Sequence, residues 1–198
     1  MTMHRRQVLT IALWTLALAA LAAVAWLRLI APLMERGMAE TIGPGDYRLA
    51  TTSGEAFTAE TLKGSPSAVF FGFTHCPEVC PTTLGDIAAF QEALGEDDRL
   101  RVYFVTVDPK RDSVEQLRDY VSWAPGVAGV SGPREEIDKA IQAFRIYARR
   151  VPLDEGGYTM DHSANILLFD RRGRFFEPIG YQEPLERAVA KIRRLNAI

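Results

Sequence analysis

An uncharged apolar run dominates the start of the chain. Residues 8–27 read VLTIALWTLALAALAAVAWL, 20 positions without a charged side chain. At a rise of about 1.5 Å per residue, a helix of this length crosses the hydrocarbon core of a bilayer. The pattern therefore predicts one N-terminal transmembrane helix at 8–27, with a short segment before it (1–7) and a tether after it (28–45).

The charges around this run predict its orientation. His4, Arg5 and Arg6 precede it, and Arg28 and Arg36 follow it. Together with the free amino terminus, the leading charges favour a cytoplasmic position for residues 1–7. We therefore expect a single-pass protein of the inner (cytoplasmic) membrane, with its domain on the periplasmic or extracytoplasmic side.

Two export signals are alternatives to a permanent anchor. The small residues 23–25 (AVA) suit a signal-peptide cleavage site. Residues 5–9 (RRQVL) resemble a twin-arginine signal, although the apolar run is long for one. Each interpretation carries the domain across a membrane, where paired cysteines form disulfides by default.

The rest of the chain alternates between continuous apolar runs and amphipathic stretches. The runs predict strands, and the stretches with helical spacing predict helices. The expected strands are 67–73, 100–107, 127–130, 164–170 and 174–179, and the expected helices are 81–94, one starting at 113, 133–148 and 184–195. Ser113 and Gln116 form a possible capping box. This order predicts an α/β domain with a mixed sheet over 46–198.

Composition and charge narrow the class of partner. Hydrophobic residues make up 47% of the chain and charged residues 24%, as in an ordinary folded domain. The formal net charge is −2, and no long basic block is present. Nucleic acid is therefore not an expected partner.

The two cysteines of the chain, Cys76 and Cys80, lie just after the first predicted buried strand, and each precedes a proline. Ligands of α/β sheets collect at the carboxyl ends of strands. A residue before proline is disfavoured in a helix, so the sequence predicts Cys80 as the N-cap of a helix that begins at Pro81. The free amides of a helix start would lower the pKa of that thiol.

Three uses of the cysteine pair are open. A purely structural disulfide would stabilise little, because the loop that it closes is short. A redox-active pair or a metal site is favoured, and two thiolates with an imidazole would suit Cu(I) or Zn(II). His4 precedes the membrane run, and the side chain of His75 should point away from that of its neighbour Cys76. His162 is left as a candidate ligand, or as a histidine satisfied by hydrogen bonds.

Three motifs carry a family likeness. Residues 72–81 (GFTHCPEVCP), 107–112 (VDPKRD) and 161–163 (DHS) resemble, in this order, the signatures of the Sco/SenC family of copper-binding proteins. The likeness extends over 40–195 and includes the N-terminal anchor; Glu78 stands where many members carry Asp. It implies a thioredoxin-like fold with an inserted β-hairpin. It also implies one copper ion per chain, as Cu(I), Cu(II) or both, held by Cys76, Cys80 and His162.

The resemblance implies a role as well. Family members act in delivering copper to the Cu-A site in subunit II of cytochrome c oxidase, or in reducing the cysteines of that site. We therefore expect a membrane-anchored copper chaperone rather than an enzyme, with an upstream copper donor and that subunit or another copper protein as partners. Asp161 is expected to orient His162 or another nearby group. Asp108 is expected either in a docking surface or hydrogen-bond network, or as a turn residue before Pro109.

Two alternative functions use the same cysteines. A thiol–disulfide oxidoreductase would reduce the cysteines of a copper-protein target, with one cysteine attacking and the other resolving. The usual C-x-x-C spacing is absent, however, and exchange alone needs no third ligand. A thiol peroxidase would need one nucleophilic cysteine with a basic partner, and the distant His162 is not required for that. Copper binding remains the preferred interpretation.

Overall fold

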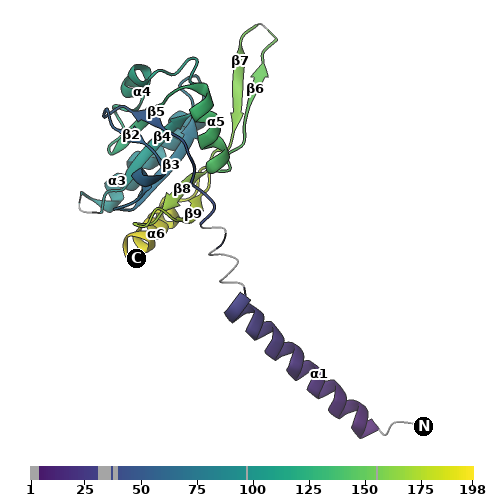
Figure 1. Ribbon diagram of the computed structural model, residues 1–198. Helices are drawn as coiled ribbons and strands as arrows, with labels where there is room; N and C mark the ends of the chain where they lie inside the picture. The colour runs from purple at the N-terminus through teal and green to yellow at the C-terminus, as the bar shows by residue number, and fades with distance from the viewer. Residues whose placement is uncertain (1–4, 31–36, 38–39, 97, 155) are drawn as a thin grey trace. The chain divides into compact units, whose positions relative to one another are not determined.

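The computed structural model describes residues 5–30, 37, 40–96, 98–154 and 156–198 (Figure 1). His4 and much of the predicted tether lie outside these residues. The chain divides into two units, Met1–Ala39 and Glu40–Ile198. The second unit thus begins six positions before the predicted boundary at residue 46.

The N-terminal unit contains a long apolar helix. Helix α1 covers Arg5–Ala25 and continues as a π-helical turn over Trp26–Ile30. Within it, the 21 residues Leu9–Leu29 are long and apolar enough to cross a membrane. An N-terminal apolar helix is confirmed, and the same features suit either an anchor or a signal.

The second unit is built on a mixed sheet. Its seven strands lie in the order β2-β1-β5-β4-β3-β8-β9, with β3, β4 and β5 parallel and the other pairs antiparallel. The strands are β1 (Leu49–Thr51), β2 (Ala56–Phe57), β3 (Ser67–Gly72), β4 (Arg101–Thr106), β5 (Val127–Ser131), β8 (Ile166–Phe169) and β9 (Phe175–Ile179). The predicted mixed sheet is confirmed, whereas β1, β2 and the 3-10 turn η2 (Ala59–Leu62) were not predicted.

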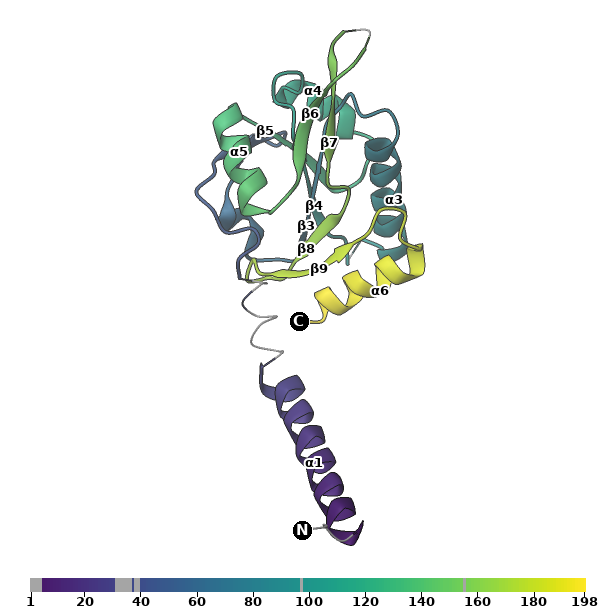
Figure 2. The same ribbon diagram turned by 90° about the vertical axis from the view of Figure 1, so that its right-hand side faces the viewer.

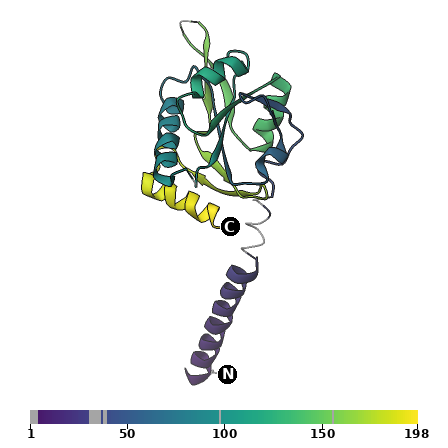
Figure 3. The same cartoon turned by 90° about the vertical axis from the view of Figure 1, so that its left-hand side faces the viewer.

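Helices cover both faces of this sheet. Figures 2 and 3 show α3 (Val79–Leu94) and α6 (Leu185–Asn196) on one side and α5 (Arg134–Ala143) on the other. All six residues of β3 are buried, as its continuous apolar run predicts. Phe70 contacts Phe104, with 5.6 Å between ring centroids, and Phe71 contacts Phe144 at 5.2 Å. The strand that precedes the cysteines is therefore buried on both faces.

A second, two-stranded sheet stands apart from the first. Strands β6 (Ala148–Pro152) and β7 (Tyr158–His162) form an antiparallel hairpin that projects from the body of the domain (Figure 1). The prediction of a helix up to residue 148 was wrong here. Helix α5 ends at Ala143, Arg145 adopts a left-handed φ of 54°, and Ala148 already begins β6. The inserted hairpin of the thioredoxin-like fold is thus present.

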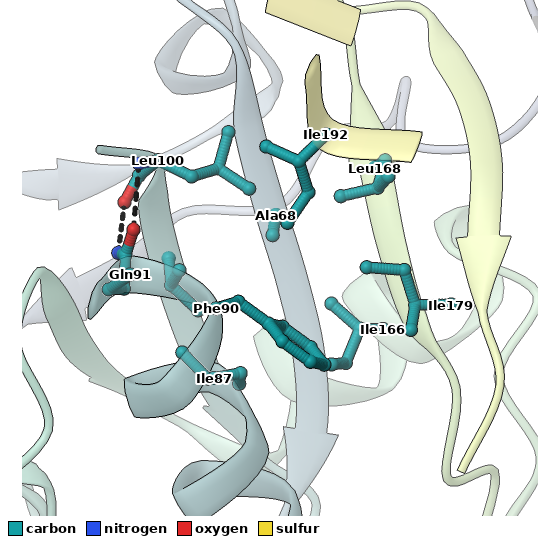
Figure 4. A pocket seen from close by; sticks show the side chains of 10 residues that line it. Ala68, Ile87, Phe90, Gln91, Leu100, Ile166, Leu168, Ile179 and Ile192 are labelled. Carbon is teal, nitrogen blue, oxygen red and sulfur yellow. Dashed lines mark hydrogen bonds between the residues drawn. The ribbon is translucent and has the colours of Figure 1, made fainter. Parts of the chain in front are cut away.

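A small apolar cavity lies between α3, α6 and the sheet (Figure 4). Its volume is about 10 Å³, and its lining includes Phe90, Ile166 and Ile192. The amide of Gln91 is committed to Leu100, since it donates to the carbonyl at 2.6 Å and accepts from the N–H at 2.9 Å. An apolar void of this size stays dry, so it belongs to core packing rather than to a site.

Candidate metal centre

The two cysteines lie where β3 passes into α3. The N–H of Cys76 donates to the carbonyl of Phe73 at 3.2 Å, which makes a tight turn after the strand. Helix α3 begins at Val79 with Glu78 as its N-cap, so the prediction of Cys80 as the N-cap was wrong. Pro81 still lies in the first turn, where an N–H has no intrahelical partner, and the proline is therefore tolerated there.

Sulfur replaces the missing side-chain cap of this helix. The Glu78 side chain makes no capping hydrogen bond, and the N–H of Cys80 donates instead to Cys76 Sγ at 3.4 Å. Gly72 gives the Cys80 side chain its space, because a Cβ at Gly72 would lie 2.7 Å from Cys80 Sγ and 2.8 Å from the Phe104 ring. The motif glycine thus has a steric reason that sequence reasoning had not assigned.

His162 reaches the cysteines from the hairpin. It is the last residue of β7, and its Nε2 lies 3.6 Å from Cys80 Sγ. Its Nδ1 lies 2.9 Å from the carbonyl oxygen of Ser163. A carbonyl can only accept, so Nδ1 carries the proton and Nε2 presents its lone pair to the sulfurs. The ring also meets Phe73 edge-on, with centroids 5.7 Å apart.

The geometry of the three side chains fits a soft metal ion. One ligand atom each from Cys76, Cys80 and His162 lies within 4.8 Å of the other two. Two sulfurs and one imidazole nitrogen are donors that Cu(I) and Zn(II) prefer. His75 is turned elsewhere, since its Nδ1 lies 2.9 Å from Thr74 Oγ1 and its side chain is half exposed.

The site opens to solvent on one side. A pocket of about 350 Å³ is lined by residues from the cysteine loop and the hairpin, among them Cys76, Tyr147, Met160 and His162. Cys76 is 9% exposed at this opening, whereas Cys80 is fully buried. A molecule that approaches the site therefore meets Cys76 and His162 before Cys80.

The two thiols share one proton unequally. A hydrogen bond from Cys80 is the main cause that lowers the pKa of Cys76 to about 4, and the backbone N–H groups of Cys80 and Glu78 lower it further. The hydrogen bond to Cys76 and burial raise the pKa of Cys80 far above its ordinary value. The sequence predicted a low pKa at Cys80; the structure assigns it to Cys76, because that sulfur is the acceptor at the helix start.

The predicted neighbours of the site have specific partners. Asp161 is exposed and pairs with Arg149 at 3.4 Å, while the group that orients His162 is the Ser163 carbonyl. Asp108 is buried and joins a hydrogen-bond network, where it pairs with Arg111 and accepts from the hydroxyl of Tyr158.

Asp112 is a neighbour of the site that sequence reasoning missed. It is fully buried and accepts from the N–H of Thr74 at 3.0 Å, from the Thr74 hydroxyl at 2.6 Å and from the Thr106 hydroxyl at 2.6 Å. Thr74 lies two residues before Cys76, so Asp112 holds the cysteine loop. Its position inside the 107–112 motif was the available signal.

Comparisons with known proteins agree with this geometry. The profile of the SCO1/SenC family matches residues 36–197. The chain is 37% identical over 141 residues to a mitochondrial SCO2 homolog of Danio rerio, which covers 69% of the chain and 50% of that protein. It is 36% identical to the SCO2-like protein RC0895 of Rickettsia conorii, with 67% of each chain covered. The chain thus spans between half and two thirds of these relatives.

Two solved structures with copper bound have the same fold. ScoI of Bradyrhizobium japonicum is 42% identical, with a TM-score of 0.70 over 77% of this chain and 99% of that one. Yeast Sco1 is 30% identical, with a TM-score of 0.69 over 76% and 87% of the two chains. With the family profile covering most of its length, this chain belongs to the SCO1/SenC family.

Proposed function

We propose that this protein is a membrane-anchored copper chaperone. It binds one copper ion through Cys76, Cys80 and His162, and it delivers the ion to the Cu-A site of cytochrome c oxidase subunit II or prepares that site. The observation that carries the proposal is the convergence of two sulfurs and one imidazole nitrogen within 4.8 Å. The copper-bound relatives support the choice of copper over zinc.

The arrangement suits a metal that must be passed on. Three soft donors bind Cu(I) and leave room for a further ligand. The pocket of about 350 Å³ lets a donor atom of a partner approach Cys76 and His162. Copper and a Cys76–Cys80 disulfide exclude each other because both use the same sulfurs, so the redox state of the pair controls loading.

A thiol–disulfide oxidoreductase is the second candidate, and the unequal exposure of the cysteines favours it. Cys76 lies at the pocket opening and Cys80 is fully buried beside it. Cys76 would attack the disulfide of a copper-protein target, and Cys80 would then attack the mixed disulfide. The cysteine pair leaves oxidised and the target leaves reduced, so one protein can reduce a partner site and also load it.

Anaerobic Cu(I) titration tests the proposal. The reduced protein should bind one Cu(I) and the oxidised protein almost none. His162→Ala should weaken Cu(I) binding by more than the roughly 10–100-fold typical of residues beyond the ligands, because it removes a ligand itself. Copper-edge spectroscopy counts the donors, and competition with a chromogenic chelator measures the affinity.

The control substitution is His75→Ala. It removes a histidine that adjoins Cys76 but is not one of the three candidate ligands. It should leave Cu(I) affinity unchanged. Equal binding by reduced and oxidised protein would exclude the shared-sulfur site. Unchanged affinity in His162→Ala together with lost disulfide exchange would make the oxidoreductase the better assignment.

A further inference from the structure

Within the part of the chain that the structure describes, the strands of the hairpin that carries His162 do not pair with the main sheet. Strands β6 and β7 pair with each other, while Cys76 and Cys80 follow β3 of the seven-stranded sheet. The distance of 3.6 Å between Cys80 Sγ and His162 Nε2 therefore depends on the short connection from His162 to β8 and on side-chain contacts that hold the rest of the hairpin.

Arg111 makes such contacts, from the loop that follows β4. Its Nη1 donates to the carbonyl of Tyr158 in β7 at 3.0 Å, and its Nε pairs with Asp108 in its own loop. Its guanidinium carbon lies 3.8 Å from the centroid of the Tyr158 ring and 5.7 Å from that of Phe73. One side chain thus contacts the hairpin, the β4 loop and the end of β3.

Tyr158 completes the arrangement. Its hydroxyl donates to Asp108 Oδ1 at 3.0 Å, and the guanidinium of Arg150 in β6 also lies 3.8 Å from its ring centroid. Two guanidinium groups cannot occupy one face of a ring at that distance, so Arg111 and Arg150 lie on opposite faces. We call these four residues the Arg111 cluster: Asp108, Arg111, Arg150 and Tyr158.

Two members of the cluster, Asp108 and Arg111, are largely sheltered from solvent, whereas Arg150 is exposed. Asp108 is 4% exposed and the Arg111 side chain 23% exposed. Cation–π contacts and charge-assisted hydrogen bonds are stronger when partly desolvated than at an open surface. The contacts of Arg111 are also directional, because a guanidinium offers several donors in a fixed plane.

The loop that follows β4 also contacts the segment that carries the cysteines. Asp112, the next residue after Arg111, accepts from the N–H of Thr74 at 3.0 Å and from its hydroxyl at 2.6 Å. Thr74 lies two residues before Cys76, and Tyr158 lies four residues before His162. A single loop therefore contacts both segments that supply ligands.

We propose that the Arg111 cluster positions His162 against Cys76 and Cys80, and so controls how fast copper leaves without changing the thiol chemistry. Arg111 and Tyr158 are positioning residues, since neither contacts the metal-binding atoms. The inference rests on the proposed copper function. It predicts that a weaker cluster lets the hairpin move and releases the imidazole first, leaving copper on the two sulfurs.

The test compares Arg111→Gln and Tyr158→Phe with wild type in the full-length protein. Gln has no charge, so it cannot form the cation–π contact with Tyr158 or the ion pair with Asp108. Phe keeps the ring and loses only the hydroxyl contact. Arg118→Gln is the matched control, because Arg118 is an exposed arginine of α4 (Val114–Val121) that donates to Thr52 and lies outside the cluster.

Three quantities are measured for each protein. They are the rate of Cu(I) release to a chelator, the imidazole nitrogen hyperfine signal of the Cu(II)-loaded form, and the reduction potential of the cysteine pair. Arg111→Gln should release Cu(I) about 10–100-fold faster and weaken the nitrogen signal. The release rate and nitrogen signal of Tyr158→Phe should lie between those of Arg111→Gln and wild type. The reduction potential of the cysteine pair should equal that of wild type in every variant.

The outcomes separate the claims. If wild type itself binds no copper, the proposed function fails. If wild type binds copper and the release rate and nitrogen signal of both variants equal those of the Arg118→Gln control, the positioning role is wrong. A reduction potential that shifts together with the release rate would show a general structural role instead. If Arg111→Gln does not fold, Tyr158→Phe decides by the same criteria.

Discussion

At the scale of single residues, the two cysteines differ in pKa: the pKa of Cys76 is lowered and that of Cys80 is raised. Cys76 accepts hydrogen bonds at the opening of a pocket, whereas Cys80 is fully buried, with its Sγ close to Gly72. Burial disfavours the charged form of a thiol, and accepted hydrogen bonds favour it. The pair therefore holds its negative charge on the sulfur that a partner can reach.

This asymmetry predicts the alkylation behaviour of the reduced, copper-free protein. With its pKa at about 4, Cys76 is already a thiolate at pH 6. Its rate with iodoacetamide should change little between pH 6 and 8, whereas an ordinary thiol reacts about tenfold faster per pH unit below its pKa. Mass spectrometry should find the label on Cys76 first.

Substitution of the hydrogen-bond donor provides the control. Cys80→Ala removes the thiol that donates to Cys76, so the pKa of Cys76 should rise and its reaction at pH 6 should slow. Cys80→Ser keeps a donor and should retain more of the reactivity. Faster labelling of Cys80 in the wild-type protein would contradict the assignment.

At the scale of elements, local signals were accurate where they concern a few adjacent residues. The predicted capping box of α4 is present, since Ser113 Oγ accepts from the N–H of Gln116 at 3.2 Å and Gln116 Oε1 accepts from the N–H of Ser113 at 2.8 Å. The predicted start of α3 and the predicted end of α5 were wrong. In the first case a sulfur outside the helix supplies the cap, and in the second a single left-handed residue, Arg145, ends the helix.

The capping box leads to a stability prediction. Ser113→Ala leaves the N–H of Gln116 without its acceptor and should lower the free energy of unfolding by about 0.5–2 kcal/mol. Chemical denaturation of the domain measures this. Ser122→Ala at the other end of α4, where the hydroxyl donates to the Asp119 carbonyl at the exposed surface, is the matched control and should change it by less than about 0.5 kcal/mol.

At the scale of the whole molecule, the second unit contains all of the candidate ligands. It begins at Glu40, and residues near this start already make hydrogen bonds within the unit. The N–H of Gly43 donates to the Ala143 carbonyl at 2.9 Å, and the hydroxyl of Tyr47 donates to the Gly43 carbonyl at 2.9 Å. The apolar helix α1 offers no cysteine or histidine.

A truncated chain of residues 40–198 should therefore be soluble, fold, and bind Cu(I) with the affinity of the full-length protein in detergent. A chain that begins at residue 48 should be much less stable. It loses Tyr47, which is 2% exposed and contacts the rings of Phe57 and Phe144, and removal of such a buried aromatic residue costs about 3–5 kcal/mol. Thermal unfolding and chelator competition compare the chains, and copper binding lost by a folded 40–198 chain would contradict the prediction.

The sequence by itself determined the features that depend on neighbours along the chain. Apolar runs identified β3, β4, β8 and β9, and the cysteine pair was placed at the end of β3. The three motifs also identified the family and, through it, the ligand set. These signals are readable because strand burial, turns and caps depend on residues only a few positions apart.

Tertiary structure alone decided how those residues act. His162 reaches Cys80 across 82 positions, and it does so on a hairpin that no local pattern had delimited. The low pKa of Cys76, the anchoring by Asp112 and the contacts of Arg111 with Tyr158 all depend on side chains that the fold brings together from distant segments. Hydrogen bonding and burial act over a few ångströms in space, so their consequences appear only once the packing is known.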